Sequence, residues 1–456
     1  MKQIILTLSL ACSFAASAQS SIPMAPIPQA PSTPAQPSPL EPDGQITPIT
    51  RGDAEHMALK NNPRVTASHL LALAAGQVTR ETRSNELPQI NSNVTAVKAE
   101  DGSRIGSGEL NSSHLYTHAG TGGTLSQLLT DFGHTRNLVV NSRLQAKAQQ
   151  QNALATEQDV LIATDQAFYR LLDAQSLLDV AIATVKARGD VKFLTQALTK
   201  SALKSDLDLN IASADLSQAQ LLQLDAENSV ASARAALAEL LAAPPETQYR
   251  AVDEGNNVPP LPPDDSLALI KEAQAQRPDL QALRLDTQAD QKFARAQQLQ
   301  RLPSISALAI GGVTPVRPDG GIFTPNWYAA AGVNLALPVF TGFRINAQAK
   351  EARLRERASE KQTQELSDAI ARDVRIATLS AQTAFRRIGV AEEFQNQTTQ
   401  ALNLAKTRYK LGLSSIVELS QAQLQSTQAT VDAVNARFDY LLALRSLDYA
   451  RGQLAP

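Results

Sequence analysis

Apolar residues recur every seven positions in two segments of the chain, one in each half. Heptads of this kind are typical of helices that pack along one another as a coiled coil. A column of alanines at this spacing lets neighbouring backbones approach closely, although an ordinary antiparallel coiled-coil hairpin would show the same column. The heptad positions are Ala212, Ala219, Ala226, Ala233 and Leu240 in the first segment, and Val417, Leu424, Val431 and Phe438, accompanied by Thr427, Val434 and Leu441, in the second.

Two long runs without proline and almost without glycine precede these heptads. They extend from about Thr135 to Lys200 and from about Arg344 to Lys410, and each predicts one helix of about 65 residues. At 1.5 Å per residue, such a helix is roughly 100 Å long. A helix of this length does not fit a compact globule, so we expect a coiled coil, a solenoid or the wall of a tube.

Shorter elements are predicted ahead of each long run. A helix near residues 53–84 should end before Leu87-Pro88, because the residue before a proline is driven out of the α region. Trp327 and Tyr328 open the last predicted strand, where a membrane barrel carries an aromatic girdle, although a soluble hairpin with one exposed tryptophan is the alternative. The strands of the second half are indicated by Ile305, Ala307 and Ala309, which alternate with Ser306, Leu308 and Ile310, and by Val333, Leu335 and Leu337, which alternate with Asn334 and Ala336.

The chain repeats itself after about 210 residues. Four landmarks keep this order and near-register, which indicates an internal duplication. We therefore predict a first repeat at residues 51–250, a linker at 251–264 and a second repeat at 265–456. The paired landmarks are Pro63 with Pro278 and Pro88 with Pro303, each 215 residues apart, Gly133 with Gly342, 209 apart, and Leu209 with Leu419, 210 apart.

Two predicted strands in each repeat give four strands per chain. The smallest outer-membrane barrels have eight strands, so a barrel built from this chain needs several copies. A dimer would supply eight strands and a trimer twelve. The strand pattern by itself leaves both open.

The N-terminal residues predict export from the cytosol. Lys2 followed by an apolar segment and Ala16-Ser17-Ala18 indicates a cleavable signal peptide at residues 1–18. Cys12, the single cysteine, lies within it, and lipidation at Cys12 is disfavoured because Ser9 stands where a lipobox has leucine. Residues 19–50 are rich in proline and predict a disordered tether without a fold.

Charge and motifs exclude several classes of protein. The net charge of −2 offers no basic surface for nucleic acid. His114 and His118 have no third ligand nearby in the sequence, so we predict no metal site. The glycine-rich stretch 119–123 lacks the lysine of a phosphate loop, and no nucleophile elbow or dinucleotide signature is present. We therefore expect no enzyme activity and no cofactor.

Eight motifs together resemble the TolC family of outer-membrane efflux proteins, over roughly residues 50 to 454. The resemblance implies a mainly α-helical chain with a β-barrel. Three copies would form a twelve-stranded barrel in the outer membrane, continued by a twelve-helix α-barrel in the periplasm. It also implies a homotrimer that contacts outer-membrane lipid, a periplasmic adaptor protein and an inner-membrane pump. The motifs are NNPRV, ELPQI, TDFGHTR and SALKSDLDLNIASADL in the first half, and QRPDL, RLPSI, LALPVFTGFR and TRYKLGLSSIVELSQAQL in the second.

The resemblance assigns roles to the two turns that join the long helices to the returning ones. Arg408, Tyr409 and Gly412 match the family pattern at the second turn, whereas Ala202 stands where the first turn commonly has glycine. The turns would dock on the adaptor through Ala202, Leu203, Lys204, Leu411, Gly412 and Leu413.

The same turns would surround a periplasmic aperture. Three copies of Glu418 around a narrow axis would repel one another and attract cations. An acidic residue there is also explained by the helix dipole alone. Gln421 replaces a second carboxylate of the family pattern, and side-chain bonds of Tyr409 would help to close the aperture. The expected aperture residues are Glu418, Gln421, Asp208, Asp206, Tyr409 and Ser414.

These features predict a passive exit duct of a tripartite efflux or type I secretion system in the outer membrane of a Gram-negative cell. The alternative is a periplasmic structural coiled-coil tether without channel activity. The strand pairs at matched positions favour the duct, because a tether has no need of them.

Overall fold

The computed structural model describes residues 46–98, 118–244, 246–253, 258–261, 265–316 and 324–454. The predicted signal peptide, Cys12, most of the proline-rich segment and His114 lie outside these residues.

The two halves of the chain repeat one another element by element. Each contributes a short helix, a second helix, two strands, a long helix and a returning helix. Matching helices are equally long, with 11 residues in α1 and α5, 22 in α2 and α6, and 67 in α3 and α7. The first half contains α1 (Arg51–Asn61), α2 (Pro63–Ser84), β2 (Gln89–Val97), β3 (His118–Thr130), α3 (His134–Lys200) and α4 (Asp206–Leu240). The second contains α5 (Ser266–Gln276), α6 (Pro278–Leu299), β5 (Ser304–Val316), β6 (Thr324–Ala336), α7 (Arg344–Lys410) and α8 (Ile416–Arg451).

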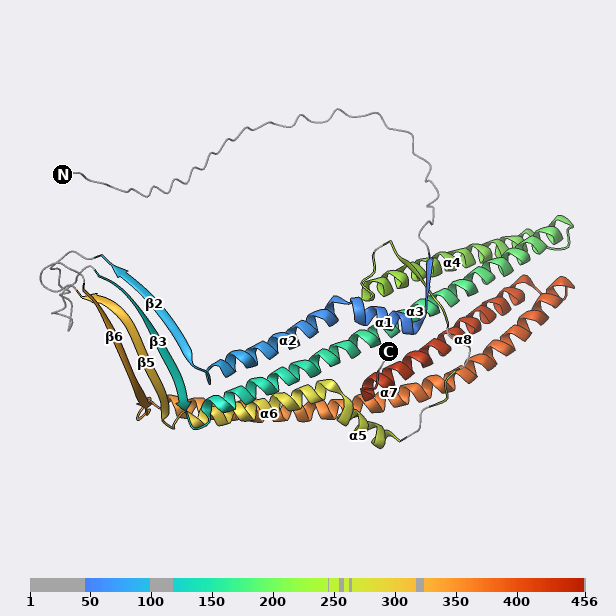
Figure 1. The fold of residues 1–456 in the computed structure, drawn as a ribbon. Coiled ribbons are helices and arrows are strands. Elements are labelled where there is room, and N and C mark those ends of the chain that lie inside the picture. Colours follow the sequence, from blue (N-terminus) through green and yellow to red (C-terminus); the bar gives the residue numbers. More distant parts are fainter. Residues whose placement is uncertain are drawn as a thin grey trace, which may run out of the picture. The chain divides into compact units, whose positions relative to one another are not determined.

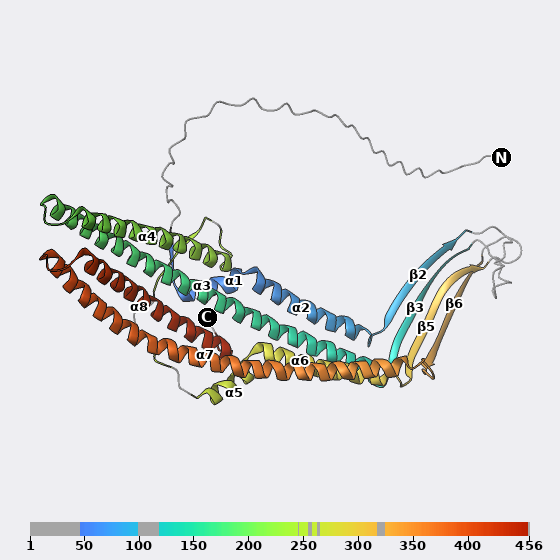
Figure 2. The same cartoon turned by 180° about the vertical axis from the view of Figure 1, so that it is seen from behind.

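The long helices α3 and α7 confirm the prediction made from the proline-free runs. Each runs without interruption to a turn and returns as α4 or α8, so the chain forms two helical hairpins. The partners of each hairpin lie side by side in both views of the ribbon (Figures 1 and 2). At their other end, α3 and α7 are directly preceded in the chain by the strands β3 and β6. Within the described part of the chain, no helix is apolar over a length sufficient to cross a membrane.

The helix predicted near residues 53–84 is in fact two helices. Asn62 has φ −65° and ψ 122°, an extended conformation that separates α1 from α2. Pro63 imposes this conformation on the residue before it and then serves as the first residue of α2, where no backbone N–H is needed. The break recurs in the second half, where Arg277 precedes Pro278 with φ −61° and ψ 121°.

Four strands form one antiparallel sheet in the order β2-β3-β5-β6. The register pairs Ile90 with Leu125 and Ile305 with Leu335. Within the described residues, β2 and β6 each have a neighbour on one side only. Large apolar side chains on these two strands are open to solvent, including Val94 at 80% and Trp327 at 79% exposure.

A second, smaller sheet corrects the prediction of no fold for the last residues of the segment 19–50, of which the structure describes 46–50. Residues Ile46–Ile49 form β1, which pairs in parallel with β4 (Gln248–Ala251). Pro48 lies within β1 and has no N–H to donate, yet a two-stranded sheet uses only one side of each strand, so the proline is tolerated. Ile49 and Tyr249 are buried in the core that α1, α3, α4 and α8 share.

Candidate functional site at the two hairpin turns

The two hairpin turns have the same backbone structure. Ala202 and Gly412 adopt left-handed conformations, with φ of 57° and 73°. The next residue in each turn donates its N–H back into the long helix: Leu203 to the Leu198 carbonyl at 2.9 Å, and Leu413 to the Arg408 carbonyl at 2.8 Å. Both long helices therefore end in a Schellman-type turn, which satisfies carbonyls that the helix leaves unpaired.

Serine caps begin both returning helices. The Ser205 hydroxyl accepts from the Asp208 N–H at 3.3 Å, and the Asp208 carboxylate accepts in return from the Ser205 N–H at 3.1 Å. Ser415 accepts from the Glu418 N–H at 3.2 Å. Asp208, expected at the aperture, is thus engaged in a capping box of α4.

Glu418 lies beside a cation of its own chain. One carboxylate oxygen is 3.6 Å from an Arg408 guanidinium nitrogen, and both side chains are about half exposed. Such a surface pair stabilises the fold little, but it places a positive charge next to the predicted negative charge of Glu418. Asp206 and Gln421 are exposed near the same turns. Each copy therefore presents both signs of charge in this region.

Tyr409, expected to help close the aperture through side-chain bonds, is buried within its own chain. It is 1% exposed, and its hydroxyl lies 3.0 Å from the Thr195 hydroxyl on α3. Burial raises the pKa of the Tyr409 phenol, and the nearby Asp208 carboxylate acts in the same direction. Lys204 places its ammonium group 4.5 Å from the centre of the Tyr409 ring and donates to the Ser414 carbonyl at 3.3 Å. These residues join the two turns to each other.

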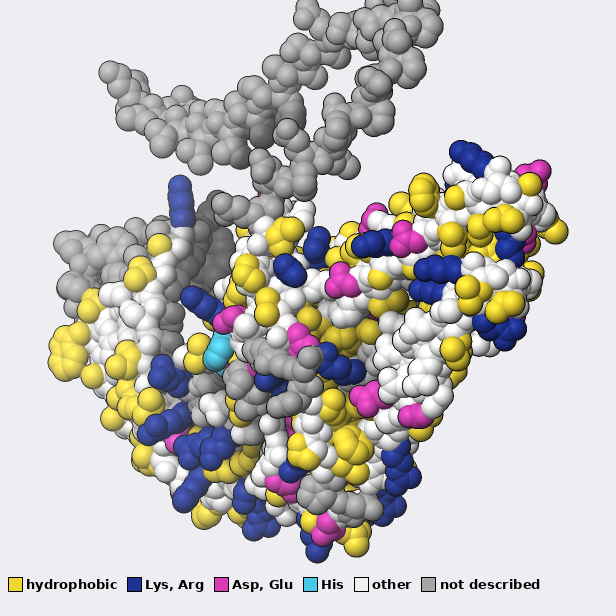
Figure 3. Space-filling model, turned by 90° about the vertical axis from the view of Figure 1, so that its right-hand side faces the viewer, with side chains coloured by type: hydrophobic (Ala, Val, Ile, Leu, Met, Phe, Trp, Pro, Cys, Tyr) yellow, Lys and Arg dark blue, Asp and Glu magenta, His cyan; other side chains and the backbone are white. Residues whose placement is uncertain are grey.

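Leucines at the turns are the exposed apolar groups of this region. Leu203, Leu411 and Leu413 are 69%, 68% and 66% exposed. Figure 3 views the molecule from the side on which both turns lie in Figure 1, and hydrophobic, basic and acidic side chains alternate on the surface that it shows. The three leucines and Gly412 are accessible for a partner, whereas Lys204 is occupied by contacts within the chain.

A polar network behind the turns was not predicted from the sequence. The buried Arg188 guanidinium on α3 donates to Asp215 on α4 at 3.0 Å and to Gln423 on α8 at 2.5 Å. Ser420 on α8 donates to the same Asp215 carboxylate at 2.6 Å. Burial lowers the pKa of Arg188, and Asp215 opposes this effect. The network links the two hairpins, and no local spacing could have revealed it because its members come from three helices.

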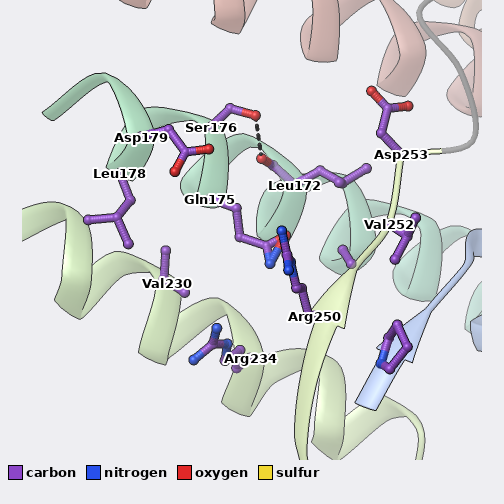
Figure 4. A pocket seen from close by; sticks show the side chains of 12 residues that line it. Leu172, Gln175, Ser176, Leu178, Asp179, Val230, Arg234, Arg250, Val252 and Asp253 are labelled. Atoms are coloured by element: carbon purple, nitrogen blue, oxygen red, sulfur yellow. Dashed lines mark hydrogen bonds between the residues drawn. The ribbon is translucent and has the colours of Figure 1, made fainter. Parts of the chain in front are cut away.

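A separate cavity of about 620 Å³ lies between α3, α4 and β4 (Figure 4). Arg234 of α4 and Arg250 of β4 line this cavity, together with Asp179 and Asp253. The Ser176 hydroxyl is bonded to the Leu172 carbonyl at 2.9 Å, within its own helix. Within the described ranges, the cavity included, no group of three or more His, Cys, Asp or Glu side chains is placed to hold a metal ion.

Known proteins share this sequence pattern and fold. The sequence model of a family described as "Outer membrane efflux protein" matches residues 55–243 and 269–453. The outer membrane protein TolC of Vibrio cholerae serotype O1 is 24% identical over 315 residues, which cover 66% of this chain and 69% of that protein. TolC of Salmonella enteritidis is 25% identical over 423 residues, covering 86% and 80%. The CmeC outer membrane channel of Campylobacter jejuni has a similar fold, with a TM-score of 0.76, 18% identity and 94% of each chain covered.

Proposed function

The chain belongs to the outer membrane efflux protein family, and from this premise we propose that it is the exit duct of a tripartite efflux or type I secretion system. The duct passively conducts substrates that a periplasmic adaptor and an inner-membrane pump deliver to it. Residues 1–18 are removed on export, and residues 51–250 and 265–456 form two repeats of one unit, joined by the linker 251–264. The proposed location is the outer membrane of a Gram-negative cell, with the helices in the periplasm.

The single observation that carries this proposal is the open four-stranded sheet. Its outer strands β2 and β6 lack a second neighbour within the described residues. Unpaired strand edges template pairing with another chain. Three copies joined β2 to β6 would give twelve strands in a closed barrel, and the exposed apolar side chains of these strands would face lipid.

The helical hairpins then form the periplasmic part of the duct. Three copies contribute twelve helices, counting α3, α4, α7 and α8 of each. The shorter α2 and α6 continue the wall, α2 beside α3 and α6 beside both α3 and α7. The exposed Leu203, Leu411 and Leu413 at the turns are suited to an adaptor with a complementary apolar surface. The wall length and the position of the turns support a route across the periplasm.

The proposed aperture carries both signs of charge. Arg408 lies beside Glu418 in each copy, so three copies contribute equal numbers of positive and negative groups at this level. We therefore infer a weaker preference for cations than a purely acidic ring would give. Asp206 adds to the negative side.

Membrane fractionation tests the duct against the structural tether. We expect the protein in outer-membrane extracts as an oligomer that resists detergent until it is heated, as a closed barrel does. Recovery of the chain only as a monomer in the soluble periplasmic fraction would reject the duct and favour the coiled-coil tether.

Charge substitutions at the turns test the aperture. Glu418→Gln leaves the three Arg408 side chains unopposed, and we expect the reversal potential in planar bilayers to shift towards anion preference. Arg408→Gln should shift it in the opposite direction. Glu239→Gln, an exposed position near the far end of α4, is the control. Unchanged selectivity in both turn variants would show that this pair does not face the conducting path.

A further inference from the structure

A buried cluster of charges joins α1, α3 and α8 away from the turns. The Arg445 guanidinium of α8 donates to Asp165 of α3 at 2.5 Å and to Glu55 of α1 at 3.0 Å. Both carboxylate side chains are fully buried. The arginine therefore holds two acidic groups from different helices against each other.

One oxygen of each carboxylate has no partner. Glu55 Oε2 and Asp165 Oδ1 are both buried without a hydrogen bond. A buried polar atom left unpaired is costly, and a carboxylate oxygen can only accept. A proton on one of the two oxygens would turn it into a donor for the other. One proton would thus satisfy both atoms.

The charges around the pair also favour a proton, with the charge of Asp448 partly screened because its side chain is 36% exposed. Arg51 and Arg445 supply two positive charges against the negative charges of Glu55, Asp165 and Asp448, so one negative charge is in excess. An uncompensated charge in the interior is strongly unfavourable. The charged groups around the Glu55–Asp165 pair are Arg51 on α1 and Arg445 and Asp448 on α8. Arg451, also on α8, lies at the edge of this cluster. Arg451 has a carboxylate of its own, Glu272 at 2.8 Å, and does not restore the balance.

We propose that Glu55 carries a proton on Oε2 and donates it to Asp165 Oδ1, and that loss of this proton loosens α1 from α3 and α8. The proposal is independent of the conducting function, since it concerns only the attachment of one helix within a copy.

The direction of the pH effect follows from the electrostatics of the site. Burial raises the pKa of Glu55 from 4.5 to about 7; the hydrogen bond with Asp165 and its charge act in the same direction, while Arg51 and Arg445 oppose the shift. A raised acid pKa means that the folded state binds the proton more tightly than the unfolded state. The stabilisation is complete below pH 4.5 and is lost as the pH rises through about 7.

Hydrogen exchange of the α1 amides in the full-length protein measures this effect. If opening of α1 exposes Glu55 to water, the protection factors, corrected for intrinsic exchange, should fall about tenfold between pH 6 and pH 8. Glu55→Gln places a permanent amide donor against Asp165 and should make the protection independent of pH. Asp165→Asn removes the negative charge beside Glu55 and should weaken the pH dependence, while burial still raises the pKa of Glu55. Glu81→Gln, on the exposed surface of α2, should retain the wild-type dependence.

Infrared difference spectroscopy identifies the proton itself. The wild-type protein should show the carbonyl stretch of a protonated carboxyl that disappears over the same pH range, and Glu55→Gln should lack it. Asp173 has its pKa raised to about 6 by burial and by Asp439, so Asp173→Asn is needed to remove its contribution and should keep the Glu55 signal. A signal that persists in Glu55→Gln but vanishes in Asp173→Asn, or wild-type α1 protection equal at both pH values, would overturn the proposal.

Discussion

The two hairpin turns carry different residues, alanine and glycine, at equivalent positions, so each can be replaced by the residue of the other. Ala202 at φ 57° and Gly412 at φ 73° occupy equivalent positions and are both exposed. A left-handed conformation costs a residue with a Cβ roughly 1 to 2 kcal/mol, and glycine avoids this cost. A Cβ added at Gly412 would meet no atom within 4 Å, so packing does not enter the comparison. We expect Ala202→Gly to stabilise the first turn and Gly412→Ala to destabilise the second, each by about 1 kcal/mol.

Local hydrogen exchange gives the measurement. The Leu203 and Leu413 amides make the bonds that close the two turns. A change of about 1 kcal/mol in local opening corresponds to about a fivefold change in exchange rate. Ala202→Gly should slow exchange at Leu203 and leave Leu413 unchanged, whereas Gly412→Ala should accelerate exchange at Leu413 and leave Leu203 unchanged. Each turn is therefore the control for the other.

Two results would contradict the reasoning. If both substitutions destabilise their turns, then Ala202 makes a favourable contact that outweighs its backbone strain. If neither has an effect, the turns do not hold left-handed residues in solution. The first result would end the equivalence of the two turns, and the second would rule out the left-handed conformation in both.

Two further predictions concern the sheet and the network behind the turns. Gly312→Ala in β5 should destabilise the sheet by about 1 to 3 kcal/mol, because its Cβ would lie 2.5 Å from the Thr121 carbonyl oxygen. Gly332→Ala in β6 is the control and should be nearly neutral, because its Cβ would have no atom within 4 Å. The temperature at which the oligomer dissociates measures both variants, and equal effects would contradict the close approach of β3 and β5. Asp215→Asn should destabilise the hairpins by about 3 to 5 kcal/mol, because it leaves the buried Arg188 without its anion. Denaturant unfolding monitored by helical circular dichroism measures that loss, and a change below about 1 kcal/mol would show that Arg188 is compensated by Gln423 or by water.

The sequence was most informative where structure depends on local pattern. Proline-free runs located α3 and α7 to within one residue at each end, because a proline or glycine is the main local signal that stops a helix. Alternation of apolar residues located β5 and β6. The strands β1 and β4 escaped notice, since each has four residues and the pairing spans about two hundred positions.

At the candidate site, too, local features could be predicted from the sequence and contacts between the hairpins could not. The turns that carry the exposed leucines and the left-handed Ala202 and Gly412 were located by the resemblance of their motifs to those of the family. The burial of Tyr409 and the pairing of Lys204 with Ser414 depend on how one hairpin meets the other, which no single turn reveals. The ion pair of Glu418 with Arg408 spans the turn between two helices and depends on the side-chain directions that the turn produces. The break at Asn62 is absent from the sequence prediction, although Pro63 is the residue that imposes it.

The equal lengths of α3 and α7 restrict how this protein can evolve. Lys204 meets Tyr409 and Ser414 only because both helices end at the same level. Deleting one residue from either helix would withdraw its turn by about 1.5 Å and rotate everything beyond the deletion by about 100°. Insertions and deletions should therefore be tolerated in these helices only as matched changes of whole heptads in both, so that the two halves lengthen or shorten together.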